Sequence, residues 1–136
     1  MDLKKVDDIV ARADKPVTIT IYQPNGEPYR AKDGTEATMD VVGSESKKYR
    51  TAEGVIADRM LSKRRAKFSK EDIERNAIFL AASAVVGWHG WEIDGKEAEP
   101  SPENVRFLLQ YKHIRNQVDE AINGHADFFE GSLDNS

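Results

Sequence analysis

The chain has 136 residues, of which 39% are hydrophobic and 32% charged, with a net charge of −4 and no cysteine. This length and apolar content are typical of one globular domain, and the lack of cysteine excludes a disulfide scaffold, a thiol nucleophile and cysteine-ligated metal sites. No apolar run approaches the roughly 20 residues that span a bilayer, and the acid-containing N-terminus lacks the apolar region of a signal peptide. We therefore expect a soluble cytosolic protein.

The N-terminal third of the chain is predicted to hold one short helix and a small antiparallel sheet. Apolar residues at helical spacing predict a helix over residues 2–13. Strict alternation predicts a strand over Val17–Tyr22, and Ala37–Val42 predicts a second one. Residues 27–31 suggest a short third strand at an edge, because a proline in it cannot donate to a ladder. The inward-facing residues of the first strand would be Val17, Ile19 and Ile21.

Two helices are predicted in the middle of the chain. Apolar residues three or four positions apart predict a helix over residues 46–65. Ser69 and Asp72 have the spacing of a capping box, which indicates the start of the next helix. Residues 76–89 carry no formal charge. This second helix is therefore predicted to run to Gly87 and to lie at the centre of the core.

The C-terminal part is predicted to be helical. Ser101-Pro102-Glu103 is typical of a helix start, since the serine caps, the proline suits the first turn and the acid favours the dipole. The pattern breaks near residues 111–113 and stops at Asn123-Gly124. The predicted fold class is α+β, a small antiparallel sheet of two or three strands followed by a helical layer of three to four helices. We divide the chain into an N-terminal helical segment (1–15), a single α+β domain (16–124) and a polar acidic tail (125–136).

The residues give no sign of catalytic or metal chemistry. His89, His113 and His125 lie far apart and form no pair with metal-ligand spacing. The chain has no Gly-x-Ser-x-Gly elbow and no glycine-rich phosphate loop, and no carboxylate has an evident apolar setting that would tune it for acid–base work. We expect no catalytic residue, no metal, no cofactor and no enzymatic activity.

Positive charge gathers in the middle of the chain. Residues 47–75 hold ten basic and five acidic residues, and the densest stretch is Lys63–Lys67. Nucleic-acid binding needs a continuous basic face and, for single strands, stacking aromatic side chains, whereas this chain is acidic overall and has only Phe68 beside the stretch. A solvated helix end is the simpler interpretation, because cations favour the negative pole of a helix dipole. We expect no nucleic-acid partner.

Two aromatic pairs have both a structural and a binding interpretation. Trp88 and Trp91 either seal the core at the end of an apolar helix or anchor a partner, and packing is favoured because a large aromatic beside an apolar helix usually packs. Phe128 and Phe129 lie in an acidic polar tail with little apolar material nearby. For this pair, docking onto the domain or onto another chain is at least as well supported as a tail that folds back.

Several motifs follow one another in an order that is similar to that of a known family. An apolar helix leads into Gly87-Trp88-His89-Gly90-Trp91, then an Asp94-Gly95 turn, then Ser101-Pro102-Glu103-Asn104 and a final helix that ends near Phe128. This order resembles the tail assembly chaperones of long-tailed double-stranded DNA bacteriophages and related prophages, over about residues 16–129. Further resembling stretches are Val17–Tyr22, Met39–Arg50 and Phe107–Leu109.

One departure from the family concerns the last two helices. The family often has a proline where these helices meet, but this chain has Tyr111-Lys112-His113-Ile114 there. The departure leaves open that the two helices run on as one bent helix.

The resemblance implies a non-enzymatic protein that binds and solubilises the tape-measure protein and helps recruit tail-tube subunits in the host cell cytoplasm. The alternative is a structural component retained in the phage tail or tail tip, and a homo-oligomer is left open. An apolar surface would bind the long helical tape-measure protein by helix-in-groove docking, provided that the apolar side chains between Ile73 and Leu109 exceed what the core needs. The expected partner-binding residues are Phe79, Val86, Trp88, Trp91, Leu108, Leu109, Phe128 and Phe129.

Overall fold

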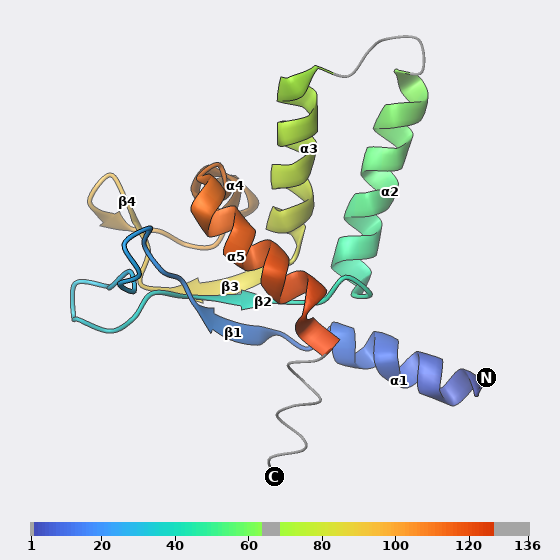
Figure 1. Ribbon diagram of the computed structural model, residues 1–136, viewed down its shortest axis with the longest axis horizontal. Helices are drawn as coiled ribbons and strands as arrows, with labels where there is room; N and C mark the ends of the chain where they lie inside the picture. Colours follow the sequence, from blue (N-terminus) through green and yellow to red (C-terminus); the bar gives the residue numbers. More distant parts are fainter. Residues whose placement is uncertain (1, 64–68, 127–136) are drawn as a thin grey trace.

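The computed structural model describes residues 2–63 and 69–126 as an α+β fold (Figure 1). The helices are α1 (Leu3–Ala13), α2 (Lys47–Ser62), α3 (Lys70–Ser83), α4 (Pro102–Leu109) and α5 (Lys112–Asn123). The strands are β1 (Val17–Thr20), β2 (Thr38–Val41), β3 (Val85–His89), β4 (Glu92–Ile93) and β5 (Lys96–Glu97). Strands β1, β2 and β3 form one antiparallel sheet in that order, and β4 pairs with β5.

The three-stranded sheet has one buried and one polar face. Ile19 lies opposite Met39, and Thr18 lies opposite Asp40. Met39 is fully buried, whereas on the other face the Thr18 hydroxyl donates to Oδ1 of Asp40 over 2.6 Å. An antiparallel sheet that is covered on one side shows this alternation. The first two predicted strands and their inward-facing side are thereby confirmed.

Residues 27–31 do not form the third strand that their pattern suggests. They make only isolated bridges, from Tyr22 to Pro28 and from Arg30 to Glu36. Tight turns on both sides of the segment limit the pairing to one residue pair at each place.

The third strand comes instead from the end of the predicted long helix. Helix α3 stops at Ser83, and β3 then pairs with β2. In a run without charges, periodicity does not separate a buried helix from a buried strand. The β-branched Val85 and Val86, followed by Trp88, favour the extended conformation, and the free edge of β2 provides the partner. The prediction of a helix running to Gly87 was wrong for this reason.

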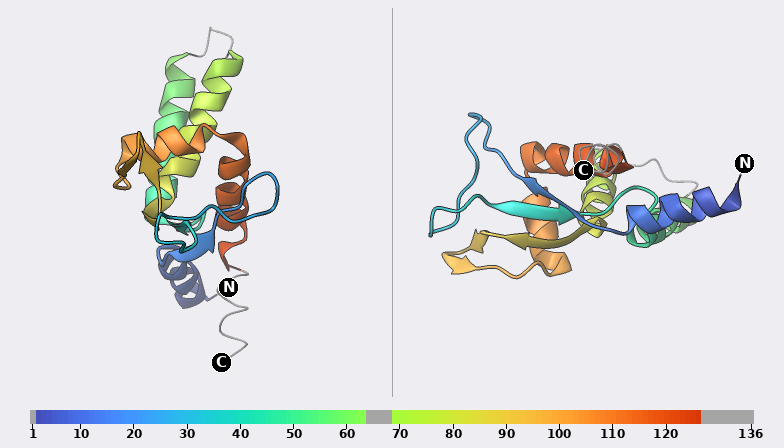
Figure 2. Two further views of the ribbon diagram at one scale, coloured as in Figure 1. Left: turned by 90° about the vertical axis from the view of Figure 1, so that its left-hand side faces the viewer. Right: turned by 90° about the horizontal axis from the view of Figure 1, so that it is seen from below.

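One face of the sheet is covered by α4, α5 and the C-terminal end of α3 (Figures 1 and 2). The buried cluster joins side chains of the sheet to these helices, and its members are Ile21, Ala37, Met39, Val41, Val42, Ala81, Ala84, Val85, Trp91, Val105, Leu108, Leu109, Ile114, Val118 and Ile122. We call the sheet with α4 and α5 the body.

Helices α2 and α3 form a hairpin, the arm, that extends away from the sheet (Figure 1). Both helices begin as predicted, because Ser46 accepts from the Tyr49 amide and Ser69 forms a reciprocal capping box with Asp72. Only Ala52, Ile56 and Ala81 of the arm helices are buried. The expectation that α3 is central to the core therefore holds only near its C-terminal end.

The last two helices are separate rather than one bent helix. A helix that ends leaves its final carbonyl groups without an intrahelical partner, and Arg115 on α5 donates to the carbonyl of Leu109, the last residue of α4, over 2.9 Å. The same guanidinium lies 3.9 Å from the carboxylate of Glu74 on α3. Arg115 therefore ties α4, α5 and the arm together.

The end of α5 lies beside the N-terminal segment, residues 1–15. Gly124 caps the helix, as its sequence predicts. His125 is buried, with its Nε2 2.6 Å from the carbonyl oxygen of Lys15. Residues 127–136, and with them Phe128 and Phe129, lie outside the described residues.

Candidate functional site

Three of the expected partner-binding side chains belong to the core. Trp91, Leu108 and Leu109 are buried, because α4 and the loop before β4 lie against the covered face of the sheet. The Trp91 indole donates to the carbonyl of Thr38 over 3.0 Å. Leu109 is completely enclosed, and Trp91 and Leu108 reach the surface only at the wall of a hollow beside Tyr29 and His113. They hold the body together and do not form the exposed apolar flank that was expected.

Trp88 has a similar structural role. Its indole donates to the carbonyl of Ala98 over 2.8 Å, and its ring centre lies 6.3 Å from that of Trp91. The side chain is half-buried. Both tryptophans therefore pack within the fold, as the favoured interpretation of the pair predicts.

Phe79 and Val86, in contrast, line an open groove where the arm meets the body. Two adjoining hollows of about 480 and 270 Å³ share Lys48, Phe79 and Ser83. We call the pair the arm groove. Its lining residues are Lys47, Lys48, Thr51, Ala52, Val55, Phe79, Ala82, Ser83, Val85, Val86, Pro100, Pro102, Val105 and Arg106.

The arm groove has an apolar floor and a cationic rim. Phe79 and Val55 are among the apolar side chains of the floor, and the guanidinium of Arg59 lies 4.7 Å from the centre of the Phe79 ring. Lys48 lines both hollows, Lys47 lines the larger one and Arg106 the smaller one, and we call these three cations together with Arg59 the rim. Among the residues that the structure describes, no acidic side chain lines the groove.

The α2 side of the groove follows from a stripe in the sequence. Lys48, Ala52, Val55 and Arg59 are separated by steps of four, three and four, which place them on one face of a helix. The neighbouring stripe that predicts α2 contains Ile56, which does pack inward. In the sequence alone, Lys48 and Arg59 make this stripe look like a solvated helix face. Its role in the groove can be recognised only once the position of α3 is known.

A separate hollow, of about 440 Å³, is lined in part by aromatic side chains, among them Tyr29, Trp91 and Tyr111. The Tyr29 hydroxyl lies 2.5 Å from Nε2 of His113, and the ring of Tyr29 lies 5.4 Å from that of Trp91. Burial, and secondarily the nearby Tyr111, raise the pKa of Tyr29. This hollow thus has a hydrogen-bonded pair at its wall but mixed charges around it, since both Arg30 and Glu92 line it.

The three histidines stay apart, each with its own partner. His89 contacts the Thr35 hydroxyl over 2.7 Å, while His113 and His125 have the partners described above. Within residues 2–63 and 69–126, no group of three or more histidine, aspartate or glutamate side chains is placed to hold a metal ion. In the same residues, no helix is both long enough and apolar enough to cross a membrane.

Comparison with known protein families, with curated proteins and with solved structures found no match to this chain.

Proposed function

We propose that this chain is a non-enzymatic tail assembly chaperone that binds an amphipathic helical segment of a tape-measure protein in the arm groove. The proposal combines the motif order given above with one structural observation. An apolar groove lined by Phe79 and Val86 is open to solvent on an arm that contributes few side chains to the core.

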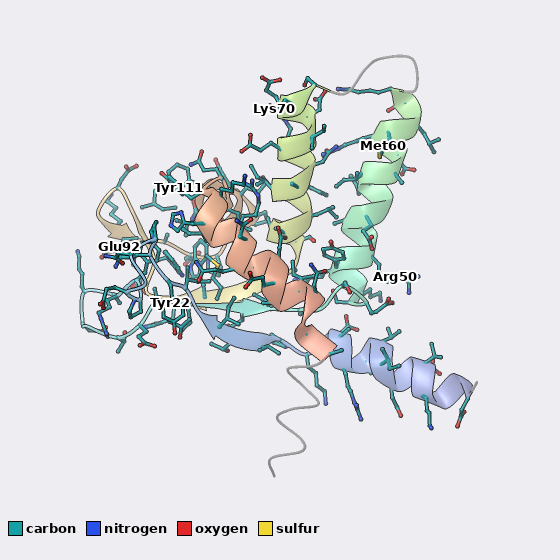
Figure 3. The ribbon with its side chains drawn as sticks, viewed as in Figure 1. Tyr22, Arg50, Met60, Lys70, Glu92 and Tyr111 are labelled. Atoms are coloured by element: carbon teal, nitrogen blue, oxygen red, sulfur yellow. The ribbon has the colours of Figure 1, made fainter. Side chains whose placement is uncertain are left out.

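The arm suits the task of shielding another chain. An exposed apolar surface is a normal mark of a protein-binding site, and the arm also exposes Met60, Leu61 and Ile73 beyond the groove. Figure 3 shows Met60 on α2 and Lys70 at the start of α3, both far from the sheet. These side chains offer a long helical partner further apolar contacts on the arm. Recruitment of tail-tube subunits would then take place on the chaperone–tape-measure complex in the host cytoplasm.

The test is capture of a fragment of the candidate tape-measure protein from the genome that encodes this chain. The fragment is co-expressed with the wild-type chain and with Val55→Asp, and soluble complex is measured by affinity capture and light scattering. Val6→Asp is the matched control, because Val6 on α1 and Val55 in the groove are the same residue type with 36% and 37% exposure. We expect Val55→Asp to lose capture and Val6→Asp to retain it.

Equal capture by both folded variants would contradict docking in the arm groove. Failure of the wild-type chain to bind or solubilise the fragment would contradict the chaperone function. Protein analysis of purified particles separates the alternative role, because a stoichiometric amount of this chain in mature tails is expected of a structural component and not of a chaperone.

A further inference from the structure

The first turns of the two arm helices carry opposite charges. Helix α3 has Glu71 and Asp72 in its first turn, which suits the positive end of a helix dipole. Helix α2 has no acid there and begins instead with Lys47 and Lys48. Cations at that end disfavour the helix, so these two lysines do not serve the stability of α2.

The charges of these lysines are also not used inside the described fold. No ion pair among the described residues involves Lys47, Lys48, Arg59 or Arg106. The Asp14 carboxylate accepts the backbone amide of Lys47 over 2.8 Å, which satisfies that amide without neutralising either lysine side chain. The cations at the rim of the arm groove therefore form no ion pair with a carboxylate of the described residues.

The dimensions of the floor suit a helix. Lys48 and Val55 are seven residues apart on α2, which is about 10 Å or two helical turns. A helix laid along this stretch would place apolar side chains at i, i+3 or i+4, and i+7 against Phe79 and its neighbours. Its flanking positions would then face the cations of the rim.

We propose that the arm groove selects amphipathic helices whose apolar stripe is flanked by aspartate and glutamate. This inference names the kind of helix that binds in the arm groove, and it rests on the proposed function. The natural partner would then be a segment of the tape-measure protein whose apolar stripe is flanked by acidic residues. Carboxylates of the incoming helix pair with Lys47 in the larger hollow, with Lys48 where the two hollows adjoin and with Arg106 in the smaller hollow. The apolar floor supplies affinity, and the rim supplies the choice between helices.

The experiment uses two designed helical peptides with the same leucine stripe, one flanked by glutamate and the other by lysine. Binding to the full chain is measured by fluorescence anisotropy at low and at physiological salt. Exposed ion pairs contribute modestly, so three such pairs correspond to about a tenfold preference for the glutamate peptide. The preference should shrink as salt screens the rim.

The decisive variant is Lys47→Glu with Lys48→Glu. It should lose the preference for the glutamate peptide, yet melt no lower than the wild-type chain, because acids suit the first turn of α2. The matched control is Lys96→Glu with Lys112→Glu, two exposed lysines outside the groove. This control should keep most of the preference.

Several results would overturn the inference. Equal affinity for the two peptides would do so, and so would a preference that survives in the Lys47→Glu, Lys48→Glu variant. A peptide-free dimer that this variant abolishes would assign the groove to a second copy of the chain instead. The peptides are independent of the tape-measure fragment. If the chain discriminates between the peptides but fails to capture the fragment, the proposed function is contradicted and the inference about the groove is not.

Discussion

The body and the arm use their apolar residues differently. In the body, side chains such as Met39, Leu109 and Val118 are completely enclosed between the sheet and the helices that cover it. In the arm, the 16 residues of α2 and the 14 residues of α3 together bury only three side chains. Apolar residues in the body thus hold the fold, whereas most of those in the arm remain at least partly accessible to another molecule.

The difference follows from the number of neighbours available to each element. A helix that lies over a sheet buries a whole face, but two helices that extend into solvent bury only the seam between them. Regions with few buried contacts open more readily than the core. The predictions below test this contrast in the body, at the junction and in the arm.

The largest effect is expected from Leu109→Ala in the body. Leu109 is 0% exposed and belongs to the central cluster, so its truncation should lower the free energy of unfolding by about 2–5 kcal/mol. Urea denaturation monitored by circular dichroism measures this change. A loss smaller than about 1 kcal/mol would mean that the body is far more loosely packed than the structure indicates.

A smaller effect of opposite sign is expected from Asp119→Asn at the junction of α5 with the arm. Burial raises the pKa of Asp119, although the charge of Arg115 opposes this. The folded state therefore favours the neutral carboxyl group. The resulting stabilisation is complete below the unfolded pKa of about 4 and is lost as the pH rises through the higher folded value.

Asparagine stays neutral at every pH. Asp119→Asn should therefore raise the melting temperature slightly at pH 7, by less than about 1 kcal/mol in stability because solvent screens this partly exposed group. At pH 3 the wild-type chain and the variant should melt alike, as thermal scans at both pH values would measure. A variant that is less stable at pH 7 would show instead that Arg115 needs the charge of Asp119.

The smallest effect is expected from Ile73→Ala in the arm. Ile73 is 63% exposed, and alanine has the higher helix propensity. The free energy of unfolding should stay within about 0.5 kcal/mol of the wild-type value in the same urea titration. A loss of more than about 1 kcal/mol would show that the arm packs more tightly than described and would weaken the contrast with the body.

Local chemistry made several elements predictable. The capping box at Ser69 and the serine–proline start at residues 101–102 fix helix starts through their own side chains. Asp94 and Gly95 both have positive φ, at 54° and 76°, which is the turn that their sequence indicates for a two-residue hairpin loop. These features depend on neighbours in the sequence, so the sequence was enough.

The candidate site was only partly predictable. Phe79 and Val86 were expected at a docking surface and do line the arm groove, whereas Leu108 and Leu109 have the same apolar character and are enclosed. The sequence shows that a side chain is apolar, but it does not show whether another segment of the chain packs over it. Lys48 and Val55 were missed because the groove exists only where two helices and the body meet.

By itself, the sequence determined where most helices begin, which residues alternate along β1 and β2, and the α+β class, since these depend on interactions within a few residues of the chain. Only the tertiary structure decided that residues 85–89 form a strand, that α2 and α3 stand apart from the sheet and that the cations of α2 border an apolar groove. These outcomes depend on contacts between segments distant in sequence, where the position of a partner, and not the local pattern, sets which conformation buries more apolar surface.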